Sequence, residues 1–209
     1  MGETRPLVTL IAMDLGDLDE DPLRQFAVWY GEAEAAGIAQ PDATALATVS
    51  ADGRPSVRMV LLKGHSARGF DFYTNHESRK ARELGINPRA ALAFHWQPLR
   101  RQVRIEGSVT RIPEPESAAY FATRPRGSQI AAWASPQSAV VPSRAALDQL
   151  YEETAARFGS GKIPPPPFWG GYRLAPVVVE FWQGRENRFH DRIRYDRGGG
   201  DWTLTRLAP

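Results

Sequence analysis

The order of the predicted strands is the feature that most constrains this fold. Short β-rich segments follow one another on both sides of a central helical stretch, and they do not alternate one by one with helices. The predicted strands are residues 45–50, 55–63, 70–74, 90–96, 102–112, 172–174, 177–183, 188–195 and 202–207. A doubly wound nucleotide-binding fold needs regular alternation, so this order disfavours it. The sequence predicts a single α+β domain built on an antiparallel barrel or sandwich.

Local signals mark several element boundaries. Asp52-Gly53, between the first two predicted strands, is a strong hairpin signal. Asp21-Pro22 predicts an N-cap followed by proline at the first helical position, and apolar residues then recur at helical spacing up to Gly37. Ser143 predicts the N-cap of a later helix. The other predicted helical segments are residues 77–86, 115–123, 127–134 and 143–158.

Two segments are expected outside the regular elements. Residues 1–20 are expected to form a flexible N-terminal tail or a strap over the surface, which leaves residues 21–209 as one domain. Pro164–Pro167 predicts a stiff polyproline surface segment, either a spacer or a ligand for a proline-reading module. No apolar run approaches the roughly 20 residues of a membrane span. Leu7–Met13 is too short and lacks the flanking features of a signal peptide.

Composition excludes several kinds of chemistry. The 209 residues contain no cysteine, which excludes thiol catalysis, thiolate metal sites and disulfides and is consistent with a reducing cytoplasm. The four histidines lack metal-ligand spacing, so no metal site is expected. A formal net charge of +2 argues against general nucleic-acid binding. Arginine nonetheless supplies nearly all of the 26 cations. This bias reflects either a GC-rich genome or bidentate binding of phosphate or carboxylate in a local pocket.

The segment from Arg188 to Tyr195 is the densest polar cluster. As a strand, its alternation places Arg188, His190, Arg192 and Arg194 on one face. Such a row is either a solvated face neutralised by neighbouring acids, or a surface that holds an anionic ligand. In the second interpretation His190 is available to donate or accept a proton near neutral pH.

Phosphate-suited groups recur in three other segments. Arg58–Lys63 is a predicted strand with cationic ends, although this segment alone favours an ordinary core strand with exposed cations. Tyr73-Thr74 leads into a helix whose N-terminus carries Ser78-Arg79-Lys80, and helix N-termini favour phosphate. The third segment offers Tyr120, Arg124 and Ser128 near a helix end. Each signal is weak alone, but their recurrence favours a phosphate-binding pocket.

Taken together, a series of ordered blocks closely resembles the pyridoxamine 5′-phosphate oxidase family. The blocks are Arg58–Lys63, Tyr73-Thr74, Ser78–Lys80, Arg101–Gly107, Arg124–Ser128, Ala132–Ser138, Trp169–Tyr172, Glu180–Gly184 and Arg188–Arg192. The resemblance covers roughly Pro22 to Pro209 in the family's order. It implies a split β-barrel homodimer with peripheral helices and with FMN at the subunit interface, where each site draws residues from both chains.

By motif match, the resemblance also implies roles for individual residues. The implied FMN contacts are Arg58, Met59, Val60, Leu61, Leu62, Lys63, Tyr73, Thr74, Arg79, Lys80, Gln102, Gln137, Ser138, Trp182 and Arg192. The implied substrate contacts are Lys63, Tyr120, Arg124, Ser128, Arg188, Phe189 and His190. Of these, Arg188 and His190 are the expected catalytic residues, lying over the pyridine ring. The strand alternation agrees, since it places Arg188, His190 and Arg192 on one face.

The implied reaction is oxidation of pyridoxamine or pyridoxine 5′-phosphate to pyridoxal 5′-phosphate in vitamin B6 biosynthesis or salvage. The flavin takes hydride from the substrate C4′, and O₂ reoxidises it to give H₂O₂, with NH₃ released from the amine substrate. The resemblance implies a cytoplasmic enzyme that binds neither nucleic acid nor membrane. Two alternatives stay open: a related split-barrel flavin oxidase acting on another reduced ring such as a phenazine precursor, and a non-enzymatic binder of flavin, haem or a vitamin phosphate.

One departure from the family concerns the N-terminus. Family members often carry an Arg-x-x-Tyr segment there that closes over the substrate. Residues 1–20 contain Arg5 but no tyrosine, so the resemblance does not extend to this lid segment and leaves its closure open.

Overall fold

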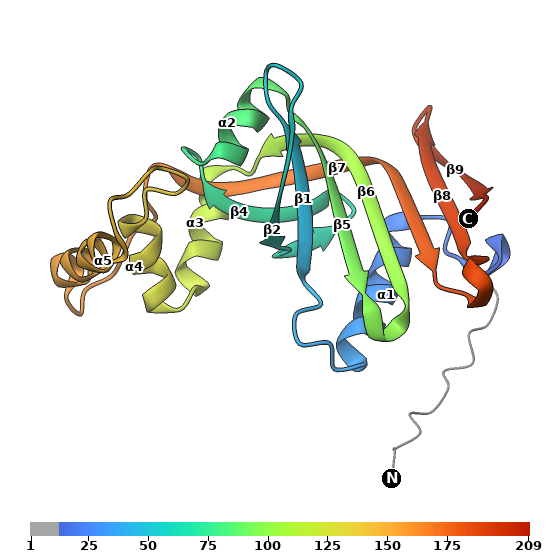
Figure 1. Cartoon of the computed structure of the whole chain (residues 1–209), viewed down its shortest axis with the longest axis horizontal. Helices are drawn as coiled ribbons and strands as arrows, with labels where there is room; N and C mark the ends of the chain where they lie inside the picture. The colour runs from blue at the N-terminus through green and yellow to red at the C-terminus, as the bar shows by residue number, and fades with distance from the viewer. Residues whose placement is uncertain (1–12) are drawn as a thin grey trace, which may run out of the picture.

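Nine strands of residues 13–209, the part of the chain that this computed structural model describes, form one antiparallel sheet. The strands are β1 (Ala43–Val49), β2 (Pro55–Leu61), β3 (Gly64–Ser66), β4 (Gly69–Asn75), β5 (Arg89–Trp96), β6 (Arg101–Arg111), β7 (Trp169–Gln183), β8 (Asp191–Gly198) and β9 (Asp201–Leu207). Their order is β2-β1-β5-β6-β7-β4-β3, with β8 paired to β7 and β9 to β8. The sheet curls in Figure 1, and together with the helices it confirms the predicted α+β class.

Strand β7 connects the two ends of the sheet. One of its edges pairs with β6, while the other pairs first with β4 and then with β8. At a rise of about 3.3 Å per residue, its 15 residues span roughly 45 Å along the strand. The sequence predicted two strands here, but β7 runs on through Pro176. A register shift between Glu106 and Gly107 of β6 lies opposite this proline, because a bulge accommodates a residue that cannot donate a ladder hydrogen bond.

The helices are α1 (Pro22–Ala35), α2 (Arg79–Ile86), α3 (Glu114–Thr123), α4 (Arg126–Ala134) and α5 (Arg144–Phe158). Helices α1 and α5 begin at the caps that the sequence predicts. The Asp21 carboxylate accepts a hydrogen bond from the Leu23 amide at 2.9 Å, and the Ser143 hydroxyl accepts one from the Ala146 amide at 3.1 Å. Helices α3, α4 and α5 gather at one end of the molecule, as Figure 1 shows. The cap signals therefore predicted helix starts to within a residue.

The buried apolar side chains of the described residues form two separate cores. In the larger core, the Phe26 ring of α1 lies with its centroid 4.9 Å from that of Phe70 and 5.1 Å from that of Phe94. Burial of each such side chain contributes about 1.5–3 kcal/mol. The smaller core consists of Phe121, Ile130, Ile163 and Trp169. It lies under the helical end, so the first residue of β7 is anchored in a core separate from the rest of the strand.

Two predicted irregular segments pack against the domain. Residues 1–12 of the predicted N-terminal segment lie outside the described residues. Beyond them, the Met13 amide donates to the Asp191 carboxylate at 3.2 Å, and the Tyr195 hydroxyl donates to the Asp19 carbonyl at 2.7 Å. In the polyproline segment Pro166 is buried, and the Trp133 indole donates to the Pro164 carbonyl at 2.7 Å. The prediction of a wholly surface segment was therefore wrong in part.

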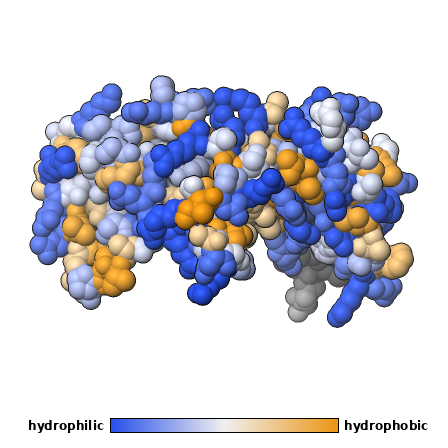
Figure 2. Space-filling view, turned by 90° about the horizontal axis from the view of Figure 1, so that it is seen from above, coloured by the Kyte–Doolittle hydropathy of each residue, from blue (hydrophilic) through white to orange (hydrophobic). Residues whose placement is uncertain are grey.

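The face seen in Figure 2 is mainly hydrophilic, with apolar side chains in separate small groups. One exposed apolar row lies on β2, which is an edge strand of the sheet: Val57 is 70% exposed, Met59 64% and Leu61 39%. These side chains are exposed to solvent in this chain, so the row marks a face that another surface can cover. None of the helices in residues 13–209 is long and apolar enough to cross a membrane.

Candidate functional site

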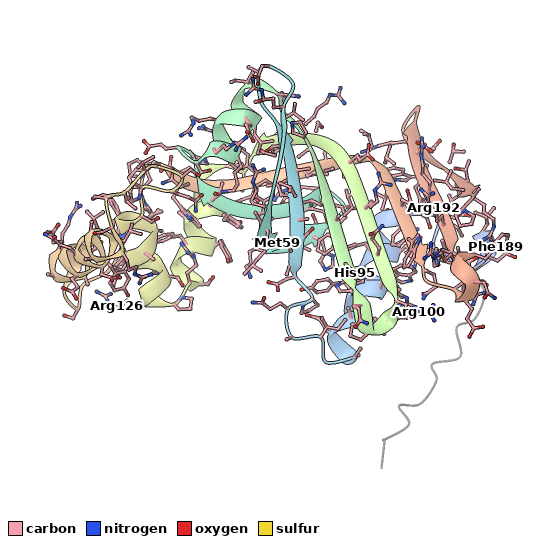
Figure 3. The ribbon with its side chains drawn as sticks, in the orientation of Figure 1. Met59, His95, Arg100, Arg126, Phe189 and Arg192 are labelled. Atoms are coloured by element: carbon pink, nitrogen blue, oxygen red, sulfur yellow. The ribbon has the colours of Figure 1, made fainter. Side chains whose placement is uncertain are left out.

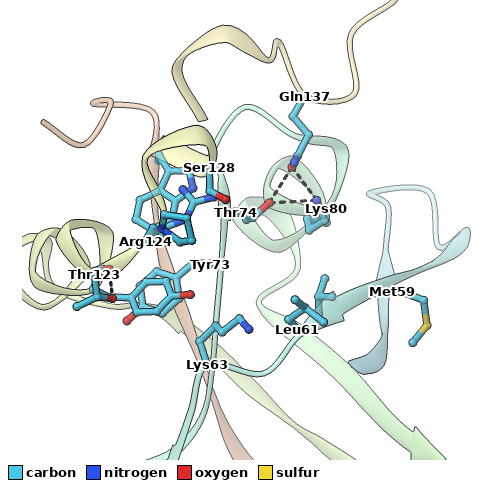
Figure 4. Close-up of a pocket in the computed structure, with 14 residues that line it drawn as sticks. Met59, Leu61, Lys63, Tyr73, Thr74, Lys80, Thr123, Arg124, Ser128 and Gln137 are labelled. Atoms are coloured by element: carbon cyan, nitrogen blue, oxygen red, sulfur yellow. Dashed lines mark hydrogen bonds between the residues drawn. The ribbon is translucent and has the colours of Figure 1, made fainter. Parts of the chain in front are cut away.

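A cavity of about 430 Å³ opens beside α3 and α4, at the ends of β2 and β4. Its lining residues are Met59, Val60, Leu61, Lys63, Tyr73, Thr74, Lys80, Tyr120, Thr123, Arg124, Pro125, Ser128, Gln137 and Trp169 (Figure 4). Three of these side chains are cations, and none is a carboxylate. We call it the cationic cavity. Its charge favours an anionic ligand.

Lys80 supplies the most buried of the three charges. It is only 9% exposed, and its Nζ donates to Gln137 Oε1 at 2.9 Å and to Thr74 Oγ1 at 3.1 Å (Figure 4). Burial, with a smaller effect from the nearby Arg58 charge, lowers the pKa of Lys80 to about 8. None of its hydrogen-bond partners in residues 13–209 carries a negative charge, so an anion in the cavity would raise this pKa again.

Arg124 supplies a second charge and is held by aromatic rings. Its Cζ lies 4.9 Å from the ring centroid of Trp169 and 5.5 Å from that of Phe121. Within residues 13–209, its Nη1 is buried and has no hydrogen-bond partner. Burial also lowers the pKa of this guanidinium. A buried donor without a partner costs free energy, which a ligand oxygen would recover.

Lys63 differs from these two cations because it has an acidic partner. Its Nζ lies 2.7 Å from the Asp42 carboxylate, and both side chains are partly exposed. Tyr120 and Ser128 line the same cavity, as does Tyr73. The cavity thus contains Lys63, Tyr120, Arg124 and Ser128, the four side chains predicted to meet the substrate phosphate.

Beside the cavity, Glu83 of α2 holds two predicted cofactor residues. Arg79 Nε lies 2.8 Å from this carboxylate and Arg58 Nη2 lies 3.3 Å from it. Burial alone would raise the pKa of Glu83, but hydrogen bonds from Thr48, Ser56 and the two arginines lower it to about 2. Neither arginine lines the cavity itself, although the Arg79 amide donates to the Ser138 hydroxyl at 3.1 Å. Leu62 is buried in the main core and does not line the cavity either.

The remaining predicted site residues lie at the other end of β7. They are Gln102, Trp182, Arg188, Phe189, His190 and Arg192, which we call the C-terminal group. Figure 3 shows Phe189 and Arg192 at the opposite end of the molecule from Arg126 of α4. Gln102 and Arg192 are both register partners of Trp182, whose ring centroid lies 4.6 Å from that of His190. None of the C-terminal group lines the cationic cavity.

The predicted strand alternation for Arg188 and His190 was wrong. Strand β8 begins at Asp191, and Arg188 ends a short 3₁₀ turn in which Asn187 and Arg188 have φ angles of +53° and +61°. Left-handed backbone cannot continue a strand, so alternation holds only from Arg192 onward, where Ile193 is buried. Phe189 is 79% exposed. Nearby, His190 Nδ1 accepts a hydrogen bond from the Arg185 amide at 3.0 Å.

Comparison with known proteins supplies the family. Residues 31–157 match the family described as pyridoxamine 5′-phosphate oxidase. Residues 169–209 match the pyridoxine 5′-phosphate oxidase C-terminal dimerisation region. The chain belongs to the pyridoxamine 5′-phosphate oxidase family.

Curated relatives within this family are similar over nine-tenths or more of their length. A protein from Salinibacter ruber named pyridoxine/pyridoxamine 5′-phosphate oxidase is 58% identical, over 91% of this chain and 90% of its own. A protein of the same name from Cupriavidus taiwanensis is 52% identical, over 100% and 99% of the two chains.

Solved structures agree on the fold. The crystal structure of PhzG from Burkholderia lata 383, in complex with tetrahydrophenazine-1-carboxylic acid, has a TM-score of 0.91 at 33% identity and covers 97% of this chain and 99% of its own. An FMN-binding protein related to the pyridoxamine 5′-phosphate oxidase family, from Nostoc punctiforme, has a TM-score of 0.72 at 21% identity, over 92% and 100% of the two chains. The predicted split-barrel fold is confirmed.

Sequence reasoning missed three residues of the cationic cavity. Thr123 and Pro125 lie at the end of α3, and Trp169 is the first residue of β7. Trp169 belonged to a block that carried the family resemblance. Its burial in the smaller core and its contact with Arg124 can be seen only in the folded structure. The acids Glu83 and Glu180 were missed for the same reason, since each is buried and pairs with an arginine far away in the sequence, Arg58 and Arg104 respectively.

Proposed function

We propose that this protein is an FMN-dependent oxidase that converts pyridoxamine 5′-phosphate or pyridoxine 5′-phosphate to pyridoxal 5′-phosphate. When bound, FMN supplies the redox chemistry: it accepts hydride from the substrate C4′ and transfers the electrons to O₂, which yields H₂O₂. The names of the relatives at 52–58% identity support this activity. A cytoplasmic location is part of the proposal, because a chain without cysteine needs no oxidising compartment.

The observation that carries the proposal is the cationic cavity, which has positive charge at two separate places and no acid in its lining. Lys80, with Thr74 and Gln137, fits the phosphate of FMN, because its buried ammonium has only neutral partners. Arg124, with Tyr120, Ser128 and Lys63, fits the phosphate of the substrate, because its buried Nη1 has no partner in residues 13–209. Two anchored phosphate esters would place the two rings between them.

We propose further that the active unit is a homodimer, in which the C-terminal group of one chain meets the cationic cavity of the other. The two groups are attached near opposite ends of β7, which spans roughly 45 Å, so one chain cannot bring both to the same ligand. The dimerisation region matched by residues 169–209 includes most of the C-terminal group. The exposed row Val57, Met59 and Leu61 supports the same arrangement, because a partner would remove these side chains from water.

In this arrangement Arg188 and His190 would lie over the substrate ring. Since His190 Nδ1 accepts a backbone hydrogen bond, the neutral imidazole carries its proton on Nε2 and presents a donor on that side. The Arg188 guanidinium supplies a positive charge for the ring phenolate. These residues hold the ring and its charge in place while hydride leaves.

The test begins with the purified protein. We expect a yellow flavoprotein that forms H₂O₂ with pyridoxamine 5′-phosphate and with pyridoxine 5′-phosphate, and whose mass in solution is that of a dimer. Absorbance, a coupled peroxide assay and light scattering measure the three properties. A colourless protein that neither binds added FMN nor forms peroxide would contradict the proposal.

An activity like that of PhzG is the second candidate function, because the PhzG structure matches over nearly the whole chain. Its complex is with a tricyclic carboxylic acid, whereas the cationic cavity offers Arg124, Ser128 and Lys63 as a separate anchor suited to a phosphate ester. Oxidation of a reduced phenazine carboxylic acid in preference to the phosphorylated vitamers would favour the PhzG-like activity.

A further inference from the structure

We propose that Trp169 is a positioning residue that holds Arg124 and Tyr120 in place for the substrate phosphate, and so sets the preference for phosphorylated substrates. This inference rests on the proposed function, which assigns Arg124 to that phosphate. No role was expected for Trp169 from the sequence beyond its place in a family block.

The first observation is the way in which Arg124 is held. No carboxylate in the described part of the chain pairs with its guanidinium, which lies 4.9 Å over the Trp169 ring and 5.5 Å from that of Phe121. An aromatic face attracts a guanidinium without neutralising it, whereas a carboxylate would compete with the phosphate for the same donors. Ring contact therefore orients Arg124 and leaves its charge available.

The second observation is that one indole stacks with two tyrosines that line the cavity. The ring centroid of Trp169 lies 5.3 Å from that of Tyr73 and 6.3 Å from that of Tyr120, with interplanar angles of 13° and 11°. Tyr73 and Tyr120 are themselves stacked, with centroids 4.1 Å apart. The three rings form one stack beside the cavity. Movement of the indole would displace Arg124 and Tyr120 together.

The third observation is that the backbone fixes Trp169 firmly. The residue begins β7 as the register partner of Asn75, and its amide donates to the Pro166 carbonyl at 3.0 Å. The ring is 9% exposed and lies in the smaller core. Two residues further on, a Cβ at Gly171 would lie 2.7 Å from the Tyr73 ring, so glycine is required for the stack to form. A rigid support of this kind preorganises a binding site.

The experiment compares Trp169→Phe, which keeps a smaller ring, with Trp169→Leu, which removes it, in the FMN-loaded protein. Trp133→Leu is the matched control. Trp133 packs against the same smaller core and has Arg157 5.0 Å from its ring, but it does not line the cavity. The measurements are KM and kcat for pyridoxine 5′-phosphate, kcat/KM for unphosphorylated pyridoxine, and calorimetric binding of inorganic phosphate.

For Trp169→Leu we expect KM for the phosphorylated substrate to rise about tenfold, and more than kcat falls, with a parallel loss of phosphate affinity. The ratio of kcat/KM between phosphorylated and unphosphorylated substrates should fall by a similar factor. Trp169→Phe should recover part of both losses, and Trp133→Leu should change neither. Equal losses for both substrates, or an unchanged KM in a folded Trp169→Leu protein, would overturn the inference.

A failure of the proposed function can be distinguished from a failure of the role proposed for Trp169. If the wild-type protein does not oxidise the vitamers, the function proposed above is wrong. Phosphate binding still tests Trp169 in that case, because calorimetry needs no turnover. Equal phosphate affinity in the wild-type and Trp169→Leu proteins would overturn the positioning role on its own.

Discussion

The cationic cavity and the sheet face formed by β6, β7 and β8 differ in whether their cations have carboxylate partners. In the cavity, Lys80 and Arg124 have no carboxylate partner in residues 13–209. On the sheet face, the buried Glu180 accepts hydrogen bonds from Arg192 Nε at 2.8 Å and from Arg104 Nη1 at 3.1 Å. Buried cations without acids are costly, so they mark the place where a ligand supplies the negative charge. Paired cations are held in position by the protein itself.

The largest effect that tests this contrast is expected at Lys80. Lys80→Met removes a charged donor from the proposed FMN phosphate site, and hydrogen bonds to charged groups contribute about 1.5–3 kcal/mol. The dissociation constant of FMN should therefore rise by about 10- to 150-fold, measured by flavin fluorescence titration. Lys162→Met, at an exposed lysine outside the cavity, is the control and should leave it unchanged.

The titration of Lys80 predicts that FMN affinity depends on pH. With a pKa of about 8 in the ligand-free protein, Lys80 is charged below that pH and neutral above it. FMN affinity should thus be lost as pH rises above about 8, by up to about tenfold per unit for a single proton. Lys80→Met should abolish this dependence. An equally steep loss of affinity in the variant would assign the titration to another group.

An intermediate effect is expected at Glu180, on the sheet face formed by β6, β7 and β8. Glu180→Gln keeps the shape of the side chain but removes the charge that holds Arg192. Since both arginine partners are partly exposed, we expect a loss of about 1–2 kcal/mol in the free energy of unfolding, less than for a fully buried pair. Turnover should fall about tenfold if Arg192 contacts the cofactor across the dimer.

Glu106→Gln provides the matched control for that variant. Glu106 pairs with Arg104 at 3.2 Å on the same face, but its side chain is 48% exposed and does not touch Arg192. Urea unfolding and peroxide formation should both stay at wild-type values. If the Glu106 and Glu180 variants lose activity equally, the position of Arg192 is not what Glu180 provides.

Local chemistry determined the parts of the fold that the sequence predicted well. The Asp52-Gly53 hairpin joins β1 and β2, and Gly53 has a φ of +81°, a conformation that glycine adopts without strain. Caps at Asp21 and Ser143 start their helices as predicted. Each of these features depends on a few adjacent residues, which a sequence contains in full.

Features that depend on distant residues were predicted less well. Alternation suggested that Arg188 continues β8, but the left-handed backbone at Asn187 and Arg188 turns the chain before the strand begins. Two separate strands were predicted at residues 172–174 and 177–183, but the chain continues as β7 because a bulge at Val177 accommodates Pro176. The candidate site was predicted as a set of residues from the family resemblance, and their roles stay predictions. Its division between the cavity and the C-terminal group is visible only in the fold.

The smallest effect is expected at Lys63, which among the cations lining the cavity is the one with an acidic partner in residues 13–209. Because Asp42 lies 2.7 Å from Lys63 and both are partly exposed, their interaction is worth about 0.2–1 kcal/mol. Asp42→Asn should leave Lys63 without its competitor and lower KM for pyridoxine 5′-phosphate by about two- to fivefold. Asp52→Asn, at an exposed ion pair in the β1–β2 hairpin, should have no effect. A higher KM in Asp42→Asn would mean that Asp42 orients Lys63 more than it neutralises it, and the contrast between paired and unpaired cations would then hold inside the cavity as well.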